Sequence, residues 1–180
     1  SQDPDRSEWV QVDLVGDGAV DEVVLVPALW RDTEDGFVSD AFPAAFRLVA
    51  GADGEDEGTV VAEFDDTASW LPRTAPIVIA MEGVNASWMR LEVTRLSRRA
   101  FDGYYVFQLS EMMVMQGETN RALRRPVISS RTSIELETWR EECLVDGILP
   151  YLMNAAEGRQ SLAMVGMVKE GEVPVVTIDL

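Results

Sequence analysis

Apolar and polar residues alternate in short runs along most of this chain, with the period of two that is typical of half-buried β-strands. Residues 88–96 are the clearest case, because Met89, Leu91 and Val93 point to one face while charged and polar residues point to the other. Clusters of glycine, proline, aspartate and asparagine separate the runs. We expect strands over residues 9–14, 22–29, 46–51, 59–64, 76–81, 88–96, 104–115 and 175–180.

Strands at this spacing, without long helical periodicity between them, favour an antiparallel arrangement over a parallel sheet, which would need helices between its strands. The sequence therefore predicts an all-β, antiparallel β-sandwich or jelly roll with minor short helices. Residues 134–147 could form a short helix or a loop. We expect the acidic residues 52–58 and the aromatic and acidic residues 30–43 to form loops.

Charge limits the partners that this chain can have. Its 180 residues include 15 lysine and arginine residues against 32 aspartate and glutamate residues, a formal net charge of −17. Such a surface repels nucleic acid and anionic membranes, so we expect no nucleic acid and no direct membrane binding. Solubility is the simplest reason for the charge, and a calcium-rich or saline environment is the alternative.

The residues available for catalysis are also limited. Histidine is absent and Cys143 is the single cysteine, which removes Ser-His-Asp and Cys-His arrangements and the usual zinc sites. Carboxylates remain, but no pair of them is singled out as the acid and base of a glycosidase. We therefore expect that the protein is not an enzyme.

Five segments of residues 9–117 resemble, in order, the later part of a discoidin domain, the coagulation-factor C-type module with a galactose-binding-like jelly-roll fold. They read WVQVDL, DEVVLVP, FPAAFRLVAG, ASWMRLEVTRL and YVFQLSEMMVMQG. The segments TNRALRRPVISS and CLVDG, which come afterwards, resemble the beginning of such a domain. The chain therefore resembles two parts of one domain in reversed order.

A repeated strand fits this resemblance. WVQVDL, residues 9–14, aligns with VVTIDL, residues 175–180, and the composition changes after Gly117. The resemblance implies that residues 1–117 are the later part of one repeat and residues 118–180 the start of a following repeat. We expect the second part to pack onto residues 9–117 and complete one sandwich.

The wider arrangement also resembles discoidin segments of large bacterial multidomain proteins, including the extracytoplasmic parts of sensor kinases. No signal peptide opens the chain, and we expect it to be a piece of a longer protein. The resemblance implies an extracytoplasmic location, periplasmic or at the cell surface, with neighbouring domains of the parent protein as partners. It implies a non-catalytic module that binds carbohydrate or another small polar ligand, or a sensing module. The alternative is a structural or protein-interaction module without a small-molecule site.

Two segments combine aromatic rings with hydrogen-bonding groups, as a site for a sugar requires. Residues 30–42 contribute the candidates Trp30, Arg31, Asp35, Phe37 and Asp40, and residues 98–105 contribute Arg99 and Tyr104. As alternatives, the aromatic residues plug the end of the sandwich, and the arginine pairs with a neighbouring carboxylate.

Glu111 is the candidate metal ligand. Strict alternation puts it on the same face as Phe107 and Leu109, where a carboxylate is costly to bury unless it is paired. Either a β-bulge at Ser110 turns Glu111 to solvent, or Glu111 lies on a structural cation. In discoidin-like domains the matching glutamate often ligates calcium or sodium, so the resemblance implies Ca²⁺ or Na⁺ here, with Asp146 as the matching carboxylate. The alternative role of Asp146 is to shape its Asp-Gly turn.

Overall fold

The structure, a computed structural model, describes residues 3–32, 36–70, 74–100, 102–130 and 140–149, and these are mostly antiparallel β-strands. The helices of this described part are two short 3-10 helices, η1 (Ala68–Trp70) and η2 (Glu141–Val145). The predicted all-β, antiparallel jelly-roll sandwich with minor short helices is therefore confirmed. The strand predicted over residues 175–180 lies outside the described residues.

The strands form one large sheet and two hairpins. The large sheet contains β1 (Glu8–Pro27), β4 (Ala45–Gly51), β5 (Thr59–Phe64), β6 (Ile77–Arg95), β9 (Leu109–Gln116), β10 (Thr119–Asn120) and β11 (Val127–Ser129). The hairpins are β2 (Leu29–Asp32) with β3 (Gly36–Ser39), and β7 (Ser97–Arg98) with β8 (Tyr105–Val106). Strands thus occupy residues 30–32 and 36–39, where the sequence predicts a loop.

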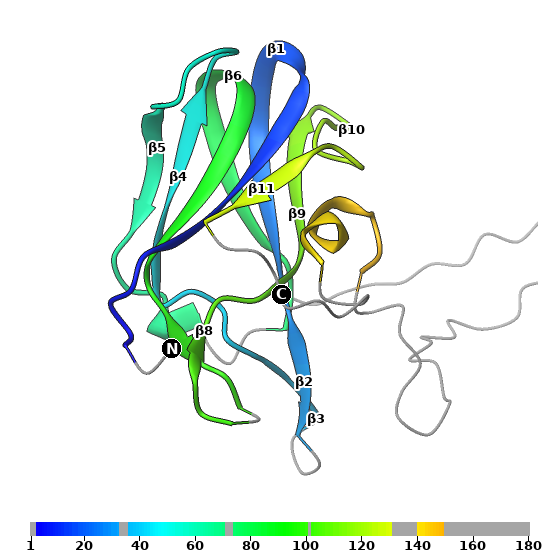
Figure 1. Ribbon diagram of the computed structural model, residues 1–180. Coiled ribbons are helices and arrows are strands. Elements are labelled where there is room, and N and C mark those ends of the chain that lie inside the picture. Colours follow the sequence, from blue (N-terminus) through cyan, green and yellow to red (C-terminus); the bar gives the residue numbers. More distant parts are fainter. Residues whose placement is uncertain (1–2, 33–35, 71–73, 101, 131–139, 150–180) are drawn as a thin grey trace, which may run out of the picture. The chain divides into compact units, whose positions relative to one another are not determined.

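β1 and β6 are the longest strands, and they fold over together at the top of Figure 1. The first half of β1 pairs with the second half of β6, and the second half of β1 pairs with the first half of β6, with register shifts between the two blocks. Gly16 and Gly83 lie in this region with φ of 62° and 70°, a conformation that glycine adopts at little cost. The sequence predicts two strands in each stretch because glycine often ends a strand, whereas here it bends a continuous one.

This fold-over produces two layers. One layer contains β11, the first half of β1, the second half of β6, β4 and β5. The other contains β10, β9, the second half of β1 and the first half of β6. Both layers contribute to one core, to which the first gives Val12, Leu48 and Leu91 and the second gives Leu25 and Met112.

Arg121 fastens the fold-over from inside, although no sequence pattern indicates this role. Its side chain is buried, and its guanidinium group donates hydrogen bonds of 2.6–3.2 Å to five backbone carbonyl oxygens. Four acceptors belong to the bend of β1 and one to β6, namely Val15, Gly16, Gly18, Ala19 and Ala86. A single cation therefore connects the bends of both long strands.

Residues 118–130 and 140–149 belong to the same compact unit as the strands before Gly117. β10 pairs with β9, β11 pairs with β1, and Leu144 and Val145 of η2 lie in the core. The described part of the chain therefore shows no boundary near residue 118. The assignment of residues 1–117 and 118–180 to two successive repeats stays a prediction.

Candidate functional site

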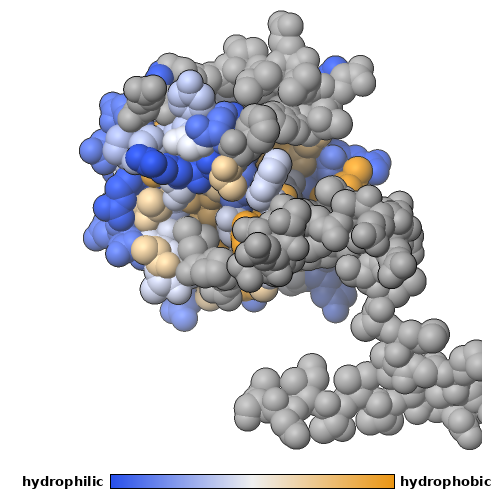
Figure 2. Space-filling model, turned by 90° about the horizontal axis from the view of Figure 1, so that it is seen from below, coloured by the Kyte–Doolittle hydropathy of each residue, from blue (hydrophilic) through white to orange (hydrophobic). Residues whose placement is uncertain are grey.

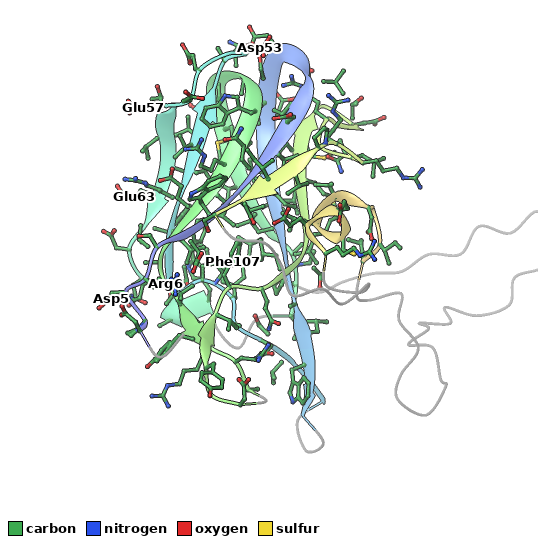
Figure 3. The ribbon with its side chains drawn as sticks, viewed as in Figure 1. Asp5, Arg6, Asp53, Glu57, Glu63 and Phe107 are labelled. Atoms are coloured by element: carbon green, nitrogen blue, oxygen red, sulfur yellow. The ribbon has the colours of Figure 1, made fainter. Side chains whose placement is uncertain are left out.

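Hairpins β2–β3 and β7–β8 extend from the same end of the sandwich, at the bottom of Figure 1. We call this the hairpin end. The acidic loop between β4 and β5 lies at the opposite end, where Figure 3 labels Asp53 and Glu57. The fold thus brings together the two segments that the sequence singles out for ligand binding.

The β2–β3 hairpin carries the first group of candidates. Trp30 lies opposite Val38, and 42% of its surface is exposed. Arg31 lies opposite Phe37 in the same ladder. Asp35 falls in the connection between the two strands and lies outside the described residues. Trp30 therefore presents a partly exposed indole at the hairpin end.

The turn of the β7–β8 hairpin is closed by Arg99 and Asp102. Arg99 donates to both carboxylate oxygens of Asp102, with 3.2 Å between Nε and Oδ1. Asp102 Oδ1 also accepts the backbone N–H of Tyr104 at 3.1 Å. The bond between the two side chains raises the pKa of Arg99 and lowers the pKa of Asp102. Arg99 is thus paired with a neighbouring carboxylate, which is the alternative to a ligand-binding role.

Exposed groups remain on the same hairpin. Tyr104 exposes 47% of its surface. The guanidinium carbon of Arg98 lies 5.1 Å from the centre of the Tyr105 ring, and Arg98 Nε donates to the Tyr105 hydroxyl group at 3.1 Å. Stacking of this kind orients a cation without neutralising it. An exposed ring and an oriented cation therefore lie at neighbouring positions.

Asp40 connects the two hairpins. Its backbone N–H donates to the carbonyl oxygen of Ala28 at 2.8 Å, which closes the base of β2–β3. Its side chain is 5% exposed, and Oδ1 accepts the N–H of Ala100 at 2.7 Å while Oδ2 accepts Nε2 of Gln108 at 3.2 Å. Both carboxylate oxygens are thus engaged within the protein, and a direct contact between Asp40 and a ligand stays a prediction.

Aromatic residues also fill the core beneath these loops. Phe42 is 1% exposed, and its ring centre lies 6.0 Å from that of Phe46 and 6.5 Å from that of Trp70. Phe64 packs against the same two rings. Phe42 therefore has the role of a plug, which is the usual one for an aromatic residue beside a strand.

The register of β9 contains a bulge at Ser110, as one of the two alternatives for Glu111 requires. Glu111 lies opposite Val26, whereas Leu109 lies opposite the next residue, Pro27, so that Ser110 has no partner in β1. One extra residue of this kind reverses the faces of a strand. The bulge therefore moves Glu111 away from the face that points into the core.

Glu111 is nevertheless fully buried. Met112 and Val114 occupy the core face of β9, while the turn after η2 packs against Glu111 from the other side, with the N–H of Gly147 donating to Oε1 at 3.1 Å. The bulge at Ser110 is therefore present, but the alternative in which it turns Glu111 to solvent is wrong. A second segment covers the outer face of the strand at this point.

Burial raises the pKa of Glu111 from 4.5 to about 7, against the effect of the Gly147 N–H, and the nearby charge of Asp146 adds to the rise. Asp146 directly precedes Gly147, whose N–H binds Glu111, so the two predicted metal ligands lie close together. Glu111 Oε2 has no hydrogen-bond partner among the described residues. Asp146 Oδ1 accepts the N–H of Ile148 at 2.7 Å, the bond expected if it shapes the turn.

These two carboxylates fit an oxygen-binding cation only in part. Glu111 Oε2 is a buried acceptor without a donor, which suits a hard cation such as Ca²⁺ or Na⁺. Within the described residues, however, no group of three or more Asp, Glu, Cys or His side chains is placed to hold a metal ion. Any cation here would need backbone or water oxygens to complete its coordination.

A second aromatic and charged group lies on the outer face of the first layer. The guanidinium carbon of Arg90 lies 5.0 Å from the ring centre of Trp9 and 4.8 Å from that of Trp88. Its nitrogens donate to Gln11 Oε1 at 2.7 and 3.0 Å, and Trp88 Nε1 donates to the carbonyl oxygen of Ala52 at 3.0 Å. These groups are bonded to one another, which indicates a role in stabilising the sheet.

Figure 2 views the molecule from below and shows mostly hydrophilic side chains, with separate hydrophobic ones, among the described residues. None of the helices in the described part is long and apolar enough to cross a membrane.

Comparison with known proteins places the chain in no family. No family model matches it, and no curated protein matches it. The structure is similar to chitosan-binding module 2, solved in complex with chitotriose and derived from a chitosanase/glucanase from Paenibacillus sp. IK-5. The sequence identity is 18% and the TM-score is 0.44, and the match covers 60% of this chain and 69% of that chain. A similarity at this level carries no argument about the ligand.

Proposed function

We propose that this chain is a non-catalytic module that binds carbohydrate or another small polar ligand, either for recognition or for sensing. The observation that carries the proposal is the meeting of hairpins β2–β3 and β7–β8 at one end of the sandwich, joined through Asp40. Trp30 on one hairpin and Tyr104 on the other are 42% and 47% exposed. The proposed ligand contacts both rings.

The chemistry of these residues suits a sugar. Sugar rings combine apolar faces, which pack on aromatic rings, with hydroxyl groups that need hydrogen-bonding partners. Trp30 and Tyr104 supply the rings, and the stacked guanidinium group of Arg98 supplies donors. Arg99 contributes indirectly, because its bonds to Asp102 hold the turn that carries Tyr104.

A glycan array followed by thermal-shift measurements tests the proposal, because a ligand that binds only the folded state raises its stability. Trp30→Ala and Tyr104→Ala should each reduce the shift strongly, with a much smaller effect on the melting temperature of the free protein. Val15→Ala is the control, since this residue is 63% exposed and lies in the fold-over at the opposite end. The absence of a shift with every sugar and peptidoglycan fragment would reject the proposal.

The alternative function is a structural or protein-interaction module without a small-molecule site. The observation in its favour is that the side chains of Asp40 and Arg99 are bonded within the protein. A partner protein or neighbouring domain that shifts the melting temperature, when no glycan does, would support this alternative.

The absence of catalysis is part of the proposal. The chain has no histidine, and no nucleophile with an adjacent base stands out in its sequence. Turnover of a chromogenic glycoside or ester that disappears when one carboxylate is substituted would contradict it.

We further propose that the module is discoidin-like and belongs to the extracytoplasmic part of a larger protein, where it contacts neighbouring domains and binds neither nucleic acid nor membrane directly. The sequence resemblance and the net charge of −17 support this setting. A cation, Ca²⁺ or Na⁺, held by Glu111 and Asp146 would have a structural role. It would neutralise two carboxylates and fasten the turn after η2 to β9.

A further inference from the structure

The backbone next to Asp40 is strained. Ala41 has φ of 53°, which a residue with a Cβ atom adopts only at a cost. Ala41 is 3% exposed, and its carbonyl oxygen accepts the backbone N–H of Gln108 at 3.2 Å. Strain of this kind persists where surrounding contacts hold it, and it often marks a functional site.

Three hydrogen bonds join residues 40–41 to the other hairpin and the segment that follows it. Ala100, in the turn between β7 and β8, donates its N–H to Asp40, and Gln108, which comes after β8, donates both its side chain and its N–H to residues 40–41. The charge of Asp40 also raises the pKa of Arg99. The turn of the β7–β8 hairpin and the segment after β8 are thus both fixed to the base of β2–β3.

We propose that Asp40 is a positioning residue, which holds hairpin β7–β8 against hairpin β2–β3 and so fixes Tyr104 relative to Trp30. The inference rests on the proposed function and deepens it, because it assigns control of affinity to a buried side chain whose two oxygens both accept hydrogen bonds within the protein. Two exposed rings on separate hairpins bind one ligand more tightly when their spacing is set before binding, because less ordering is then needed.

A carboxylate suits this position better than an amide would. Asp40 faces two N–H donors, one at each oxygen, and an ionised carboxylate accepts at both. Asparagine at this position is uncharged and has one oxygen, so it accepts the Ala100 N–H less strongly and pairs with Gln108 only if the Gln108 amide turns over. Asp40→Asn should therefore weaken the link while it preserves size, and Asp40→Ala should remove it.

Hydrogen exchange measured by mass spectrometry tests the link without any ligand. In Asp40→Ala, exchange across residues 97–108 should rise about tenfold or more, because the loss of hydrogen bonds to a charged acceptor favours local opening. Strands β4 and β6 should keep their exchange rates. Gln108→Leu serves if Asp40→Ala does not fold, and Asp66→Asn, at an exposed aspartate outside this link, is the matched control.

Binding measurements test positioning itself, with the glycan that gives the largest thermal shift. Asp40→Asn and Asp40→Ala should lower the affinity about tenfold or more, since a tenfold change corresponds to the loss of one good contact. The loss should disappear in a Tyr104→Ala background, because Asp40 acts through Tyr104. A residue that merely stabilised the fold would lower the affinity equally in both backgrounds.

The outcomes separate the two proposals. Unchanged exchange in residues 97–108 of Asp40→Ala would overturn the link, and faster exchange with unchanged affinity would overturn the positioning role while the proposed function stands. Faster exchange in a protein that binds no glycan would support the link and reject the proposed function, and with it the control of affinity.

Discussion

Replacing Arg121 with methionine should loosen the fold-over of β1 and β6. Arg121 is 4% exposed and is bonded to five carbonyl oxygens, four from the bend of β1 and one from Ala86 of β6. Methionine keeps an unbranched apolar stem of similar length but has no donor. The substitution therefore removes the hydrogen bonds with little change in packing.

The expected cost follows from the carbonyl groups left behind. The five bonds do not simply add, because desolvating the guanidinium group already costs several kcal/mol. Ala86 is fully buried, so its carbonyl oxygen would be left as a buried acceptor without a donor. This lowers the free energy of unfolding by about 1–3 kcal/mol. The acceptors in the bend of β1 belong to residues that are exposed or half-buried, so water can replace part of their bonds. We expect a total loss of about 3 kcal/mol, near the lower end of the range for breaking a buried charge interaction.

Urea unfolding at constant m-value measures this loss as a lower midpoint. For a domain of this size, thermal unfolding should show a decrease of about 6–12 °C in the melting temperature. Arg95→Met is the matched control, since the Arg95 side chain is 44% exposed and lies 3.7 Å from Asp66. It should cost less than about 1 kcal/mol.

A chemical rescue makes the test specific. In Arg121→Ala, free guanidinium ion at low millimolar concentration should raise the melting temperature relative to sodium chloride of equal ionic strength, because it can occupy the vacated carbonyl groups. The wild-type protein should show no such gain. An Arg121→Met variant as stable as the wild type would refute the reasoning.

Further predictions concern Glu111 and Gly58, which lies under the Trp88 ring. Because the pKa of Glu111 is raised to about 7, the folded protein binds more protons than the unfolded chain between about pH 4.5 and 7, and the metal-free protein should lose roughly 3 kcal/mol as the pH rises through this range. Glu111→Gln should flatten that part of a urea-unfolding pH series, and an unchanged slope would contradict the assignment. Calcium added to chelator-treated protein should raise the melting temperature in wild type and not in Glu111→Ala, whereas a flat wild-type titration would reject calcium. A Cβ atom at Gly58 would lie 2.4 Å from the Ala50 carbonyl oxygen and 2.5 Å from the Trp88 ring. Gly58→Ala should therefore lower the free energy of unfolding in urea by about 1–3 kcal/mol. Gly16→Asn should cost less, because a Cβ atom at Gly16 would have no other atom within 4 Å.

Alternation located the strands of the large sheet because these have one face on a shared core. Residues 88–96 show this, with Met89, Leu91 and Val93 all fully buried. The strand predicted over residues 104–115 is wrong, since β8 and β9 belong to different sheets. Alternation could not show that two predicted strands are halves of one, since a glycine such as Gly83 can end a strand or bend it. That distinction depends on the partner strand, which bends at the same place.

The exposed residues of the candidate site could be predicted from the sequence, but most of the contacts that hold them could not. Aromatic residues in polar segments pointed to Trp30 and Tyr104, and both are exposed at the same end. The partner of Arg99 is three residues away in an Asp-Gly turn, so a local pattern could indicate it. The partner of Asp40 could not be predicted, because Gln108 lies 68 residues away and meets it only after the hairpins fold.

The fold-over of β1 and β6 restricts sequence change in the two layers more than in the two hairpins. β1 and β6 each belong to both layers, so the two layers cannot evolve, or be exchanged, as independent pieces. Hairpins β2–β3 and β7–β8 form no strand pairs with this shared sheet, so their length and composition can vary while the layers stay intact. Relatives of this chain should therefore resemble one another at the bends of β1 and β6 and diverge at the hairpin end, where new ligand preferences can arise without a new fold.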